Sequence, residues 1–520
     1  MKENKYIGVT IGPILKTLAM ARKTRELWGA SYIFSYIMKT LIQLLIKNGI
    51  NKDDIIIPYA RDIDKEEYHY GAGLYPDRLI LHCKKNDFEK VKQTVDNVLS
   101  GLGEKIAGHM NGNREDIQDY INNCFQVYFL EKEVKGKKGP ILELSPYLDT
   151  MELQEKFIPI DENQYLSKFL DRVNGSFLFE DGFKQHKKSF DSLIEISARE
   201  LKKIDEARFK EIIKKHYERE KKGEEDEAFI IKELKKIPEI KEKNFFKTCH
   251  KYIAIVQADG DNIKKTLEKI GSSKENLGDF SKKLKTFAED AARIIHEFGG
   301  TPVYIGGDDL LFFAPVVNQE TIIDNKKVSS IFNLIDILDS NFKNSFDNAS
   351  LSYGLSISYY KFPLNEALEQ ARELLLNHAK KYKDEITGKE KNALAFKVLK
   401  HSGASFGTTF NKSSDVYKQF EELLDLYGGE ERHLNSLVHN LQLSRKIFKQ
   451  IGKNEEKVRN FLNNSFDEDV HKGFEKFFEK AAGLIFSIYK EGQEESEVKK
   501  FETIYSILRT LHFLKRKDNE

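Results

Sequence analysis

Residues 301–315, TPVYIGGDDLLFFAP, decide the fold, because two apolar runs enclose two glycines and two aspartates. The runs TPVYI and LLFFAP have the composition of buried β-strands. Gly306 and Gly307 allow the tight turn of a hairpin and leave space for a phosphate to approach the backbone. The segment therefore predicts a β-hairpin with Asp308 and Asp309 at its tip.

A second acidic segment precedes this hairpin. In KYIAIVQADGD, residues 251–261, an apolar strand pattern ends in Asp259, Gly260 and Asp261. Strand and helix patterns over residues 248–405 follow the order β-α-β-β-α-β with an extra element, which is the ferredoxin-like arrangement. In that arrangement the strand lies beside the hairpin, so we expect Asp259 close to Asp308 and Asp309.

Adjacent carboxylates repel one another, so this cluster predicts a cation or solvent between them. Hard carboxylate oxygens suit Mg²⁺ or Mn²⁺, which keep waters and bridge substrate phosphates. Two such ions could activate a 3′-hydroxyl group and stabilise a pyrophosphate leaving group. Each motif alone has a plainer interpretation: GGDD as a solvated hairpin turn, and DGD as a Ca²⁺-like loop or a helix N-cap. The candidate ligands are Asp259, Asp261, Asp308 and Asp309.

The rest of the chain divides into three further regions. Residues 1–135 alternate strand and helix patterns, residues 136–247 are mostly helical and very charged, and residues 406–520 contain helical patterns only. We therefore expect an α+β protein with two ferredoxin-like domains, a helical insert between them and a C-terminal helical bundle. The most charged segment of the insert, residues 198–243, predicts a solvated helical arm or linker, with a nucleic-acid contact as the alternative.

Composition narrows the classes of function. The 520 residues carry a formal net charge of +1, so the overall charge predicts neither nucleic-acid nor membrane binding, and any basic surface must be local. Cys83, Cys124 and Cys249 form no CxxC pair, which argues against a zinc site or a disulfide framework. No apolar run approaches about 18 residues, and the N-terminus has no signal-peptide core. We expect a soluble, cytoplasmic protein.

The motifs resemble those of a known family. ADGD followed by YIGGDDLLFF is similar to the palm domain of class III nucleotidyl cyclases and GGDEF enzymes. Residues 367–403, ALEQARELLLNHAKKYKDEITGKEKNALAFKVLKHSG, resemble the end of one such palm. Residues 11–37, IGPILKTLAMARKTRELWGASYIFSYI, and 71–81, GAGLYPDRLIL, resemble a first palm of the same family. That family is the large polymerase/cyclase subunit of type III-B, Cmr-type, CRISPR effector complexes.

The resemblance implies an activity and partners. Members of the family work in a complex with other Cmr-type subunits and a guide RNA. Binding of a matching target RNA switches on a palm that uses ATP and divalent metal to make a nucleotide second messenger, usually cyclic oligoadenylate. Asp259, Asp308 and Asp309 match the catalytic, metal-binding acids, with Asp261 as a further candidate. The residues that match or fit phosphate and nucleotide binding are Gly260, Gly306, Gly307, Lys380 and Lys381; an ordinary pair of lysines at a helix C-terminus is the alternative for the last two.

The first palm departs from the active pattern. Its first strand, YIGVTIG, ends in no DGD, and no GGDD turn follows. It should bind no catalytic metal pair but could form half of the substrate pocket. The chain begins at this palm, so we expect no HD nuclease domain. In some members of the family without that domain, S-adenosylmethionine is the acceptor of AMP. Tyr59, Asp62 and Glu143 could provide the aromatic and carboxylate surroundings of a sulfonium group, with ordinary surface acids as the alternative.

Two other classes of function compete with an RNA-activated nucleotidyltransferase. One is a stand-alone GGDEF-like diguanylate cyclase, which the degenerate first palm and a helical C-terminal region fit poorly. The other is a non-enzymatic scaffold subunit of an RNA-guided complex. The intact acids at residues 259, 261, 308 and 309 argue against the scaffold.

Overall fold

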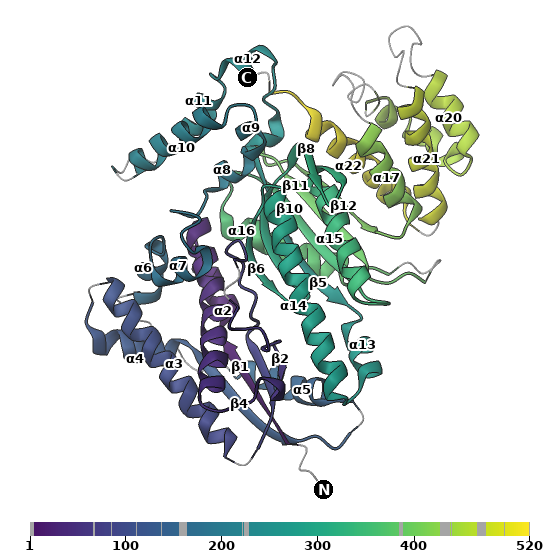
Figure 1. Ribbon diagram of the computed structural model, residues 1–520. Helices are drawn as coiled ribbons and strands as arrows, with labels where there is room; N and C mark the ends of the chain where they lie inside the picture. The colour runs from purple at the N-terminus through teal and green to yellow at the C-terminus, as the bar shows by residue number, and fades with distance from the viewer. Residues whose placement is uncertain are drawn as a thin grey trace.

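The computed structural model describes most of the chain. The residues outside the description are 1–4, 66–67, 85, 111, 137, 155–163, 221, 223–227, 384–387, 427–436, 438, 465–474, 493–494 and 519–520. Helices and strands are mixed along the described residues, and the expected α+β class is confirmed. Figure 1 shows two β-sheets with helices around them, the N-terminal one purple and the other green.

The first sheet has four antiparallel strands in the order β2-β3-β1-β4. They are β1 (Lys5–Gly12), β2 (Ile55–Ile57), β3 (Arg78–His82) and β4 (Gln126–Glu133). One face packs against α2 (Thr24–Lys47) and α3 (Asp87–Met110) in a core that includes Val9, Leu41 and Val95. The helices α1 (Ile14–Ala19) and α4 (Arg114–Cys124) complete this region.

The second sheet has six strands in the order β12-β11-β10-β5-β7-β6. They are β5 (Tyr252–Asp261), β6 (Thr301–Gly306), β7 (Asp309–Pro315), β10 (Ser350–Tyr359), β11 (Ala393–Leu399) and β12 (Ser405–Asn411). Only the β10–β11 pair is parallel. The order β6-β7-β5-β10 repeats β2-β3-β1-β4 of the first sheet, which is the order of a β-α-β-β-α-β unit. The hairpin of β8 (Val317–Ile323) and β9 (Lys326–Ser330) is the extra element.

Both faces of the second sheet are covered. The helices α14 (Lys274–Glu297) and α15 (Ile331–Ser345) pack on one face, where Phe287 and Phe332 are fully buried. On the other face lie α16 (Leu364–Glu373), α8 (Leu193–Ser197) and the start of α2, which contributes Leu27. Since α2 also packs on the first sheet, it belongs to the cores of both halves.

Helix α2 has a second property that its burial explains. Contrary to our sequence expectation, this one helix among the described residues is long and apolar enough, by length and composition, to cross a membrane. However, 67% of its most apolar window is buried inside the fold. Trp28 is fully buried, and its Nε1 donates a hydrogen bond to the carbonyl oxygen of Gly71 at 2.7 Å. Its burial is that of a core helix.

Short helices connect the two sheets. They are α5 (Pro140–Glu152), α6 (Tyr165–Asp171), α7 (Phe177–Phe183), α8, α9 (Arg199–Lys202), α10 (Glu206–Glu220), α11 (Ala228–Leu234) and α12 (Pro238–Glu242). Within the described part of residues 198–243 the charged faces are exposed, as expected of a solvated arm, but the apolar faces pack. Phe209, Ile230 and Leu234 form a small core with Tyr360, because apolar residues recur at helical spacing among the charges.

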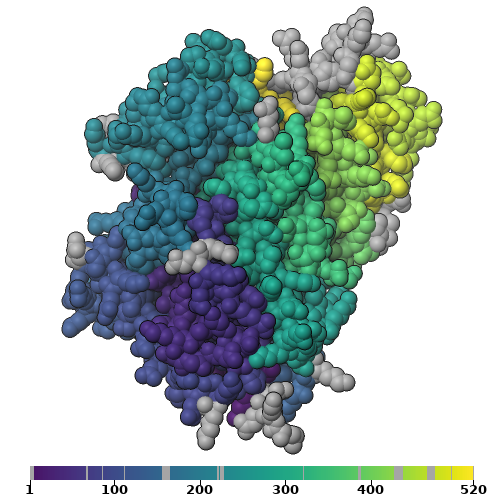
Figure 2. Space-filling view, in the orientation of Figure 1, coloured from purple at the N-terminus to yellow at the C-terminus, as the bar shows by residue number. Residues whose placement is uncertain are grey.

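The described C-terminal elements after β12 are helical. They are α17 (Asp415–Leu426), α19 (Arg445–Ile451), α20 (Glu455–Asn464), α21 (Glu475–Glu491) and α22 (Glu497–Lys515). Thr503 Oγ1 of α22 lies 3.4 Å from Thr408 Oγ1 of β12, so α22 packs beside the edge strand. Figure 2 shows this yellow-green region at the upper right, with teal and green residues between it and the purple and blue first half.

Candidate active site

The GGDD segment forms a hairpin tip beside the end of β5. Gly306, the last residue of β6, pairs with Asp309, the first of β7, and Ala258 of β5 pairs with Leu310. A Cβ atom on Gly260 would lie 2.3 Å from Asp308 Oδ2, so only glycine leaves room for that carboxylate. The structure therefore brings the Asp259 segment and the hairpin tip together, as the strand order predicts.

Lys380 joins this cluster from the far side. Its Nζ donates hydrogen bonds to the carbonyl oxygens of Asp259 and Gly260, at 2.9 and 2.7 Å, and to Asp261 Oδ1 at 2.9 Å. The same Nζ lies 3.0 Å from Asp259 Oδ2. The ammonium group is thus fully used in fixing the end of β5, and its charge lies next to the acids. Lys381 points elsewhere and bonds Asn377 Oδ1 at 2.9 Å.

A π-helical turn places Lys380 rather than Lys381 against β5. Residues Leu374–Ala379 form this turn after α16. The helix approaches β10 very closely at Gly354, where a Cβ atom would lie 2.1 Å from the carbonyl oxygen of Ala371. The extra residue per turn shifts the helical register, and the lysine directly after the turn faces the strand.

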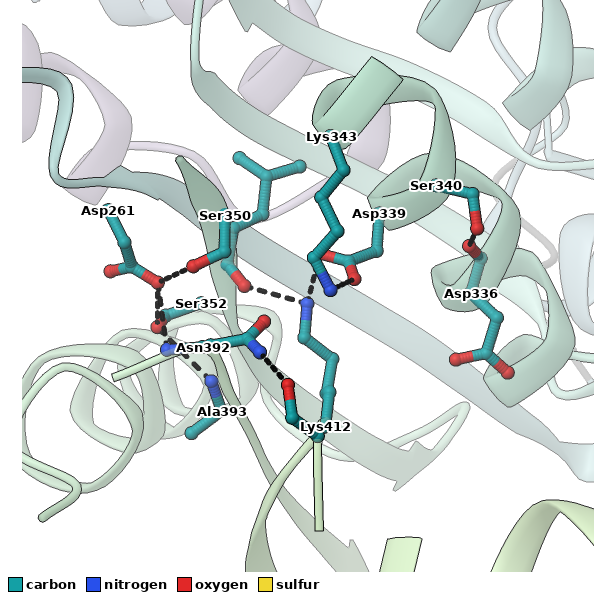
Figure 3. Close-up of polar contacts among 12 residues, drawn as sticks. Asp261, Asp336, Asp339, Ser340, Lys343, Ser350, Ser352, Asn392, Ala393 and Lys412 are labelled. Carbon is teal, nitrogen blue, oxygen red and sulfur yellow. Dashed lines mark hydrogen bonds and ion pairs between the residues drawn. The ribbon is translucent and has the colours of Figure 1, made fainter. Parts of the chain in front are cut away.

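Asp261 is enclosed by hydrogen-bond donors. It is fully buried, and its Oδ2 accepts bonds from Ser350 Oγ, Ser352 Oγ and the backbone nitrogen of Asn392, at 3.0, 2.7 and 3.0 Å. Figure 3 shows these donors converging on the carboxylate. With Lys380 on Oδ1, both oxygens are occupied, so this carboxylate anchors Lys380 and the ends of three strands.

Desolvation and repulsion between neighbouring carboxylates favour the protonated, neutral forms of Asp308 and Asp309. Desolvation raises the pKa of Asp308 to about 6, and the neighbouring Asp259 adds to the shift. Desolvation, followed by repulsion from Asp308 and Asp259, also raises the pKa of Asp309 well above its usual value. Lys380 opposes both shifts without cancelling them. A further cation would complete this set of hard oxygen donors.

The described residues do not form a complete metal site on their own. Within this part of the chain, no three side chains of Asp, Glu, His or Cys are grouped closely enough to hold an ion. Mg²⁺ is commonly bound by one or two carboxylates together with substrate phosphates and waters. The donor set at the tip fits an ion that arrives with a phosphate.

A cavity of about 410 Å³ opens beside the hairpin tip. Gly306, Gly307, Asp308 and Asp309 line one side, and Tyr59, Asp77 and Ile80 of the first half line the other. The backbone nitrogen of Ile305 donates a bond to the carbonyl oxygen of Gly73 at 3.1 Å, which joins β6 directly to the first half. The cavity therefore exists only where the two halves meet.

The three residues of the first half that the sequence suggested for acceptor binding differ in their position relative to the cavity. Tyr59 lines the cavity. Asp62 forms an ion pair with Lys285, a cavity residue of α14 whose Nζ lies 5.9 Å from the centre of the Tyr59 ring. Glu143 Oε1 accepts a bond from the backbone nitrogen of Gly136 at 3.0 Å, and this side chain is not part of the cavity wall.

The sequence reasoning missed Asp77 and Arg78. They stand at the start of β3, the strand that holds the place of β7 in the first sheet, so they correspond in position to Asp308 and Asp309. Desolvation raises the pKa of Asp77 to about 6, with Arg78 opposing the shift. Arg78 Nη2 lies 2.8 Å from Glu152 Oε1. The signal was present in YPDRLIL, as an acid directly before a strand.

Two family models match the chain. The model for the second palm domain of Cas10/Cmr2 matches residues 252–395, and that for the N-terminal region of the CRISPR-associated protein Cmr2 matches residues 6–112. A curated relative, CRISPR system Cmr subunit Cmr2 of Pyrococcus furiosus, is 31% identical over 186 residues. That match covers 30% of this chain and 19% of the relative, so the chain is matched to about a fifth of the relative's length.

Solved structures share the fold over nearly the whole chain. A type III-B Cmr-beta structure in the apo state has a TM-score of 0.54 at 12% identity, covering 95% of this chain and 82% of the other. A Csm1–Csm4 cassette in complex with cA4 has a TM-score of 0.52 at 11% identity, covering 98% and 70%. The same cassette in complex with one ATP has a TM-score of 0.52 at 12% identity, covering 99% and 70%.

Proposed function

Because the chain belongs to the Cas10/Cmr2 family, we propose that it is a nucleotidyltransferase of a type III-B CRISPR complex, in which target RNA switches on synthesis of a nucleotide second messenger from ATP. One observation carries the proposal: Asp308 and Asp309 lie at a hairpin tip beside Asp259, on a cavity between two halves of the molecule. The cassette structures with ATP and with cA4 support the same chemistry by likeness of fold.

The proposed layout is two palm domains facing each other. The half with residues 248–405 is the active palm, and the half with residues 1–135 is a degenerate palm. The repeated strand order of the two sheets supports this assignment. Residues 136–247 and 406–520 are then the helical insert and the C-terminal helical bundle. The cavity of about 410 Å³ between the palms receives the triphosphate on the side of Gly306 and Gly307.

Each residue of the active palm has a proposed task. Asp259, Asp308 and Asp309 would hold divalent ions, Mg²⁺ or Mn²⁺, which when bound neutralise the triphosphate and lower the pKa of an attacking hydroxyl group. Lys380 keeps the end of β5 in place and supplies a positive charge beside the carboxylates. Asp261 holds Lys380 and the neighbouring strands rather than substrate.

The acceptor of the AMP group has two candidates. A second ATP would give cyclic oligoadenylate, and S-adenosylmethionine would give an S-adenosylmethionine–AMP conjugate. Tyr59 and Asp77 line the wall where the acceptor would lie. The two products are separated by supplying labelled ATP and cognate RNA with and without S-adenosylmethionine. A product formed only with S-adenosylmethionine identifies the conjugate.

The proposed partners are the other Cmr-type subunits, with guide and target RNA bound through the complex in the cytoplasm. The structure of Cmr-beta bound to cognate target RNA, with a TM-score of 0.52, supports this by fold. The alternatives from the sequence are a stand-alone diguanylate cyclase and a non-enzymatic scaffold. Incubating the complex with cognate RNA, Mg²⁺ and each nucleoside triphosphate separately distinguishes all three.

The decisive variant is Asp308→Asn with Asp309→Asn. It removes two negative charges with little change in volume, so the complex should assemble normally. Synthesis should fall by at least about a hundredfold, on the scale of losing groups that stabilise transition-state charge. Normal synthesis by this variant in an assembled complex would rule the proposal out.

A further inference from the structure

A second cavity, of about 490 Å³, lies on the other side of the second sheet. Its walls come from the start of α2, from α8 and α10, and from the connection between β10 and α16. It shares no lining residue with the cavity at the GGDD hairpin. Nothing in the proposed nucleotidyl transfer uses it.

The charge of this cavity is one-sided. Its described lining residues include Arg22, Lys23, Arg25 and Lys361, and none of them is Asp or Glu. Lys23 and Arg25 are ion-paired with Asp171, at 3.4 and 3.1 Å. Arg22 and Lys361 are exposed, and the described residues offer neither of them an ion-pair partner. The Glu26 carboxylate accepts hydrogen bonds from the backbone nitrogens of Arg22 and Lys23, so the positive charge open to a ligand is that of the Arg22 and Lys361 side chains.

The helix that begins at the cavity adds to this potential. Pro363 and Leu364, at the start of α16, line the wall, and among the described side chains none caps this helix N-terminus. The partial positive charge of a helix N-terminus favours an anion. A phosphate near Arg22 and Lys361 would therefore meet both the side-chain charges and the helix dipole.

Aromatic rings line the same cavity. Phe362 and Tyr217 are half-buried, and Tyr360 and His216 are more deeply placed. The hydroxyl group of Tyr217 donates to Glu195 Oε2 at 2.9 Å, which fixes its ring. Fixed aromatic faces beside cations are the combination by which proteins stack a base and neutralise its phosphate.

We propose that this cavity is a nucleotide-binding site, in which Arg22 and Lys361 contact a phosphate and Phe362 and Tyr217 contact the base. The nucleotide is either free or part of a single-stranded RNA, since both present the same phosphate and base. This site is separate from the proposed catalytic cavity, and its existence does not depend on nucleotidyl transfer.

The first test measures binding of two fluorescent probes to the full chain by anisotropy: a short single-stranded RNA and an ATP analogue. EDTA is present, so that metal-dependent binding at the GGDD hairpin does not contribute. The variant is Arg22→Glu with Lys361→Glu. Its matched control is Arg114→Glu with Lys326→Glu, which makes the same charge change at exposed residues that line neither cavity.

The affinity for the bound probe should fall by about tenfold or more in the variant and by less than about twofold in the control. If the probe is RNA, the slope of log affinity against log salt should fall by about 0.7, the value for one lost phosphate contact on a single strand. Binding of RNA alone identifies a strand as the ligand, and binding of both probes identifies a free nucleotide as sufficient. Failure of the wild-type chain to bind either probe would overturn the proposal, as would equal losses in the variant and the control.

The second test concerns the base. Phe362→Leu keeps an apolar side chain of similar size and removes the aromatic face. Affinity should fall by about tenfold for the probe with bases and remain unchanged for an abasic strand of the same length, because stacking acts on the base alone. The same loss for both strands would show that the ring is structural, and would overturn the assigned role of Phe362.

Discussion

Asp259 and Asp261 lie two residues apart on β5, but they differ in exposure and in hydrogen bonding, and therefore in their proposed roles. The side chain of Asp259 is 36% exposed and touches only Lys380 among the ion pairs of the described residues. The side chain of Asp261 is fully buried and has three donors on one oxygen and Lys380 on the other. A carboxylate with unoccupied oxygen lone pairs can still bind a metal ion, whereas a buried carboxylate whose oxygens are all hydrogen-bonded stabilises the fold.

Lys380 and Lys381 offer a test with a built-in control. Lys380→Met should lower synthesis about tenfold or more, because the end of β5 loses three hydrogen bonds and the acids lose their nearest positive charge. Lys381→Met should leave synthesis unchanged, since among the described residues that ammonium group bonds Asn377 and does not contact β5. Initial rates and melting temperatures of both variants in the complex are the measurements. Equal rates for the two variants would contradict the assigned role of Lys380.

Glu195, in α8, should make stability depend on pH. Desolvation first, and then repulsion from Asp191, raise its pKa to about 7, against a usual value of 4.5. The folded chain therefore holds an extra proton between pH 4.5 and 7, and the stability that this provides is lost as the pH rises through 7. Glu195→Gln should remove this part of the dependence, so that the melting temperature changes less between pH 5 and 8. If the difference in melting temperature between wild type and variant were constant with pH, it would contradict the raised pKa of Glu195.

At the scale of elements, the close approach of α16 to β10 positions the site. Gly354→Ala would bring a Cβ atom to 2.1 Å from the carbonyl oxygen of Ala371 and 2.5 Å from the backbone nitrogen of Leu375. The helix must then move, and the π-helical turn that presents Lys380 moves with it. We expect the free energy of unfolding to fall by about 1–3 kcal/mol. The rate of synthesis should fall by a larger factor than the amount of folded protein does.

The matched control for this helix–strand contact is Gly101→Ala. Gly101 lies inside α3, and a Cβ atom there meets nothing within 4 Å. Alanine is favoured over glycine in a helix by about 0.5–1 kcal/mol, so this variant should be as stable as the wild type or more so. Chemical denaturation of both variants measures the difference. If Gly354→Ala were as stable as Gly101→Ala, the contact would not position α16.

The sequence predicted the elements of the second sheet better than the details of their contacts. The apolar runs around GGDD and before DGD identify β5, β6 and β7, and the β-α-β-β-α-β order places Asp259 beside Asp308. The lysine that faces β5 could not be chosen, because a π-helical turn changes the register by one residue without a clear signal. Asp77 was missed because its significance depends on the hairpin-tip acids, which are far from it in the sequence but line the same cavity.

At the scale of the whole molecule, the cavity depends on how the two halves are held together. Helix α2 contributes Trp28 to one core and Leu27 to the other. Ionic contacts join α14 to the first half, including Lys274 Nζ to Asp54 Oδ1 at 2.7 Å. Because these contacts fix the first sheet opposite the hairpin tip, the proposed function predicts that residues of the first half contact the acceptor.

This arrangement predicts unequal effects of acids in the first half. Asp77 lines the cavity, and its charge also raises the pKa of Asp309 on the opposite wall. Asp77→Asn should therefore change product formation about tenfold, in the total rate or in the ratio of products with and without S-adenosylmethionine. Glu143→Ala should leave both unchanged, because Glu143 bonds Gly136 outside the cavity. Labelled ATP and cognate RNA with the assembled complex give both quantities. If Glu143→Ala altered the product and Asp77→Asn did not, the acceptor would lie nearer α5 than the cavity wall formed by β3.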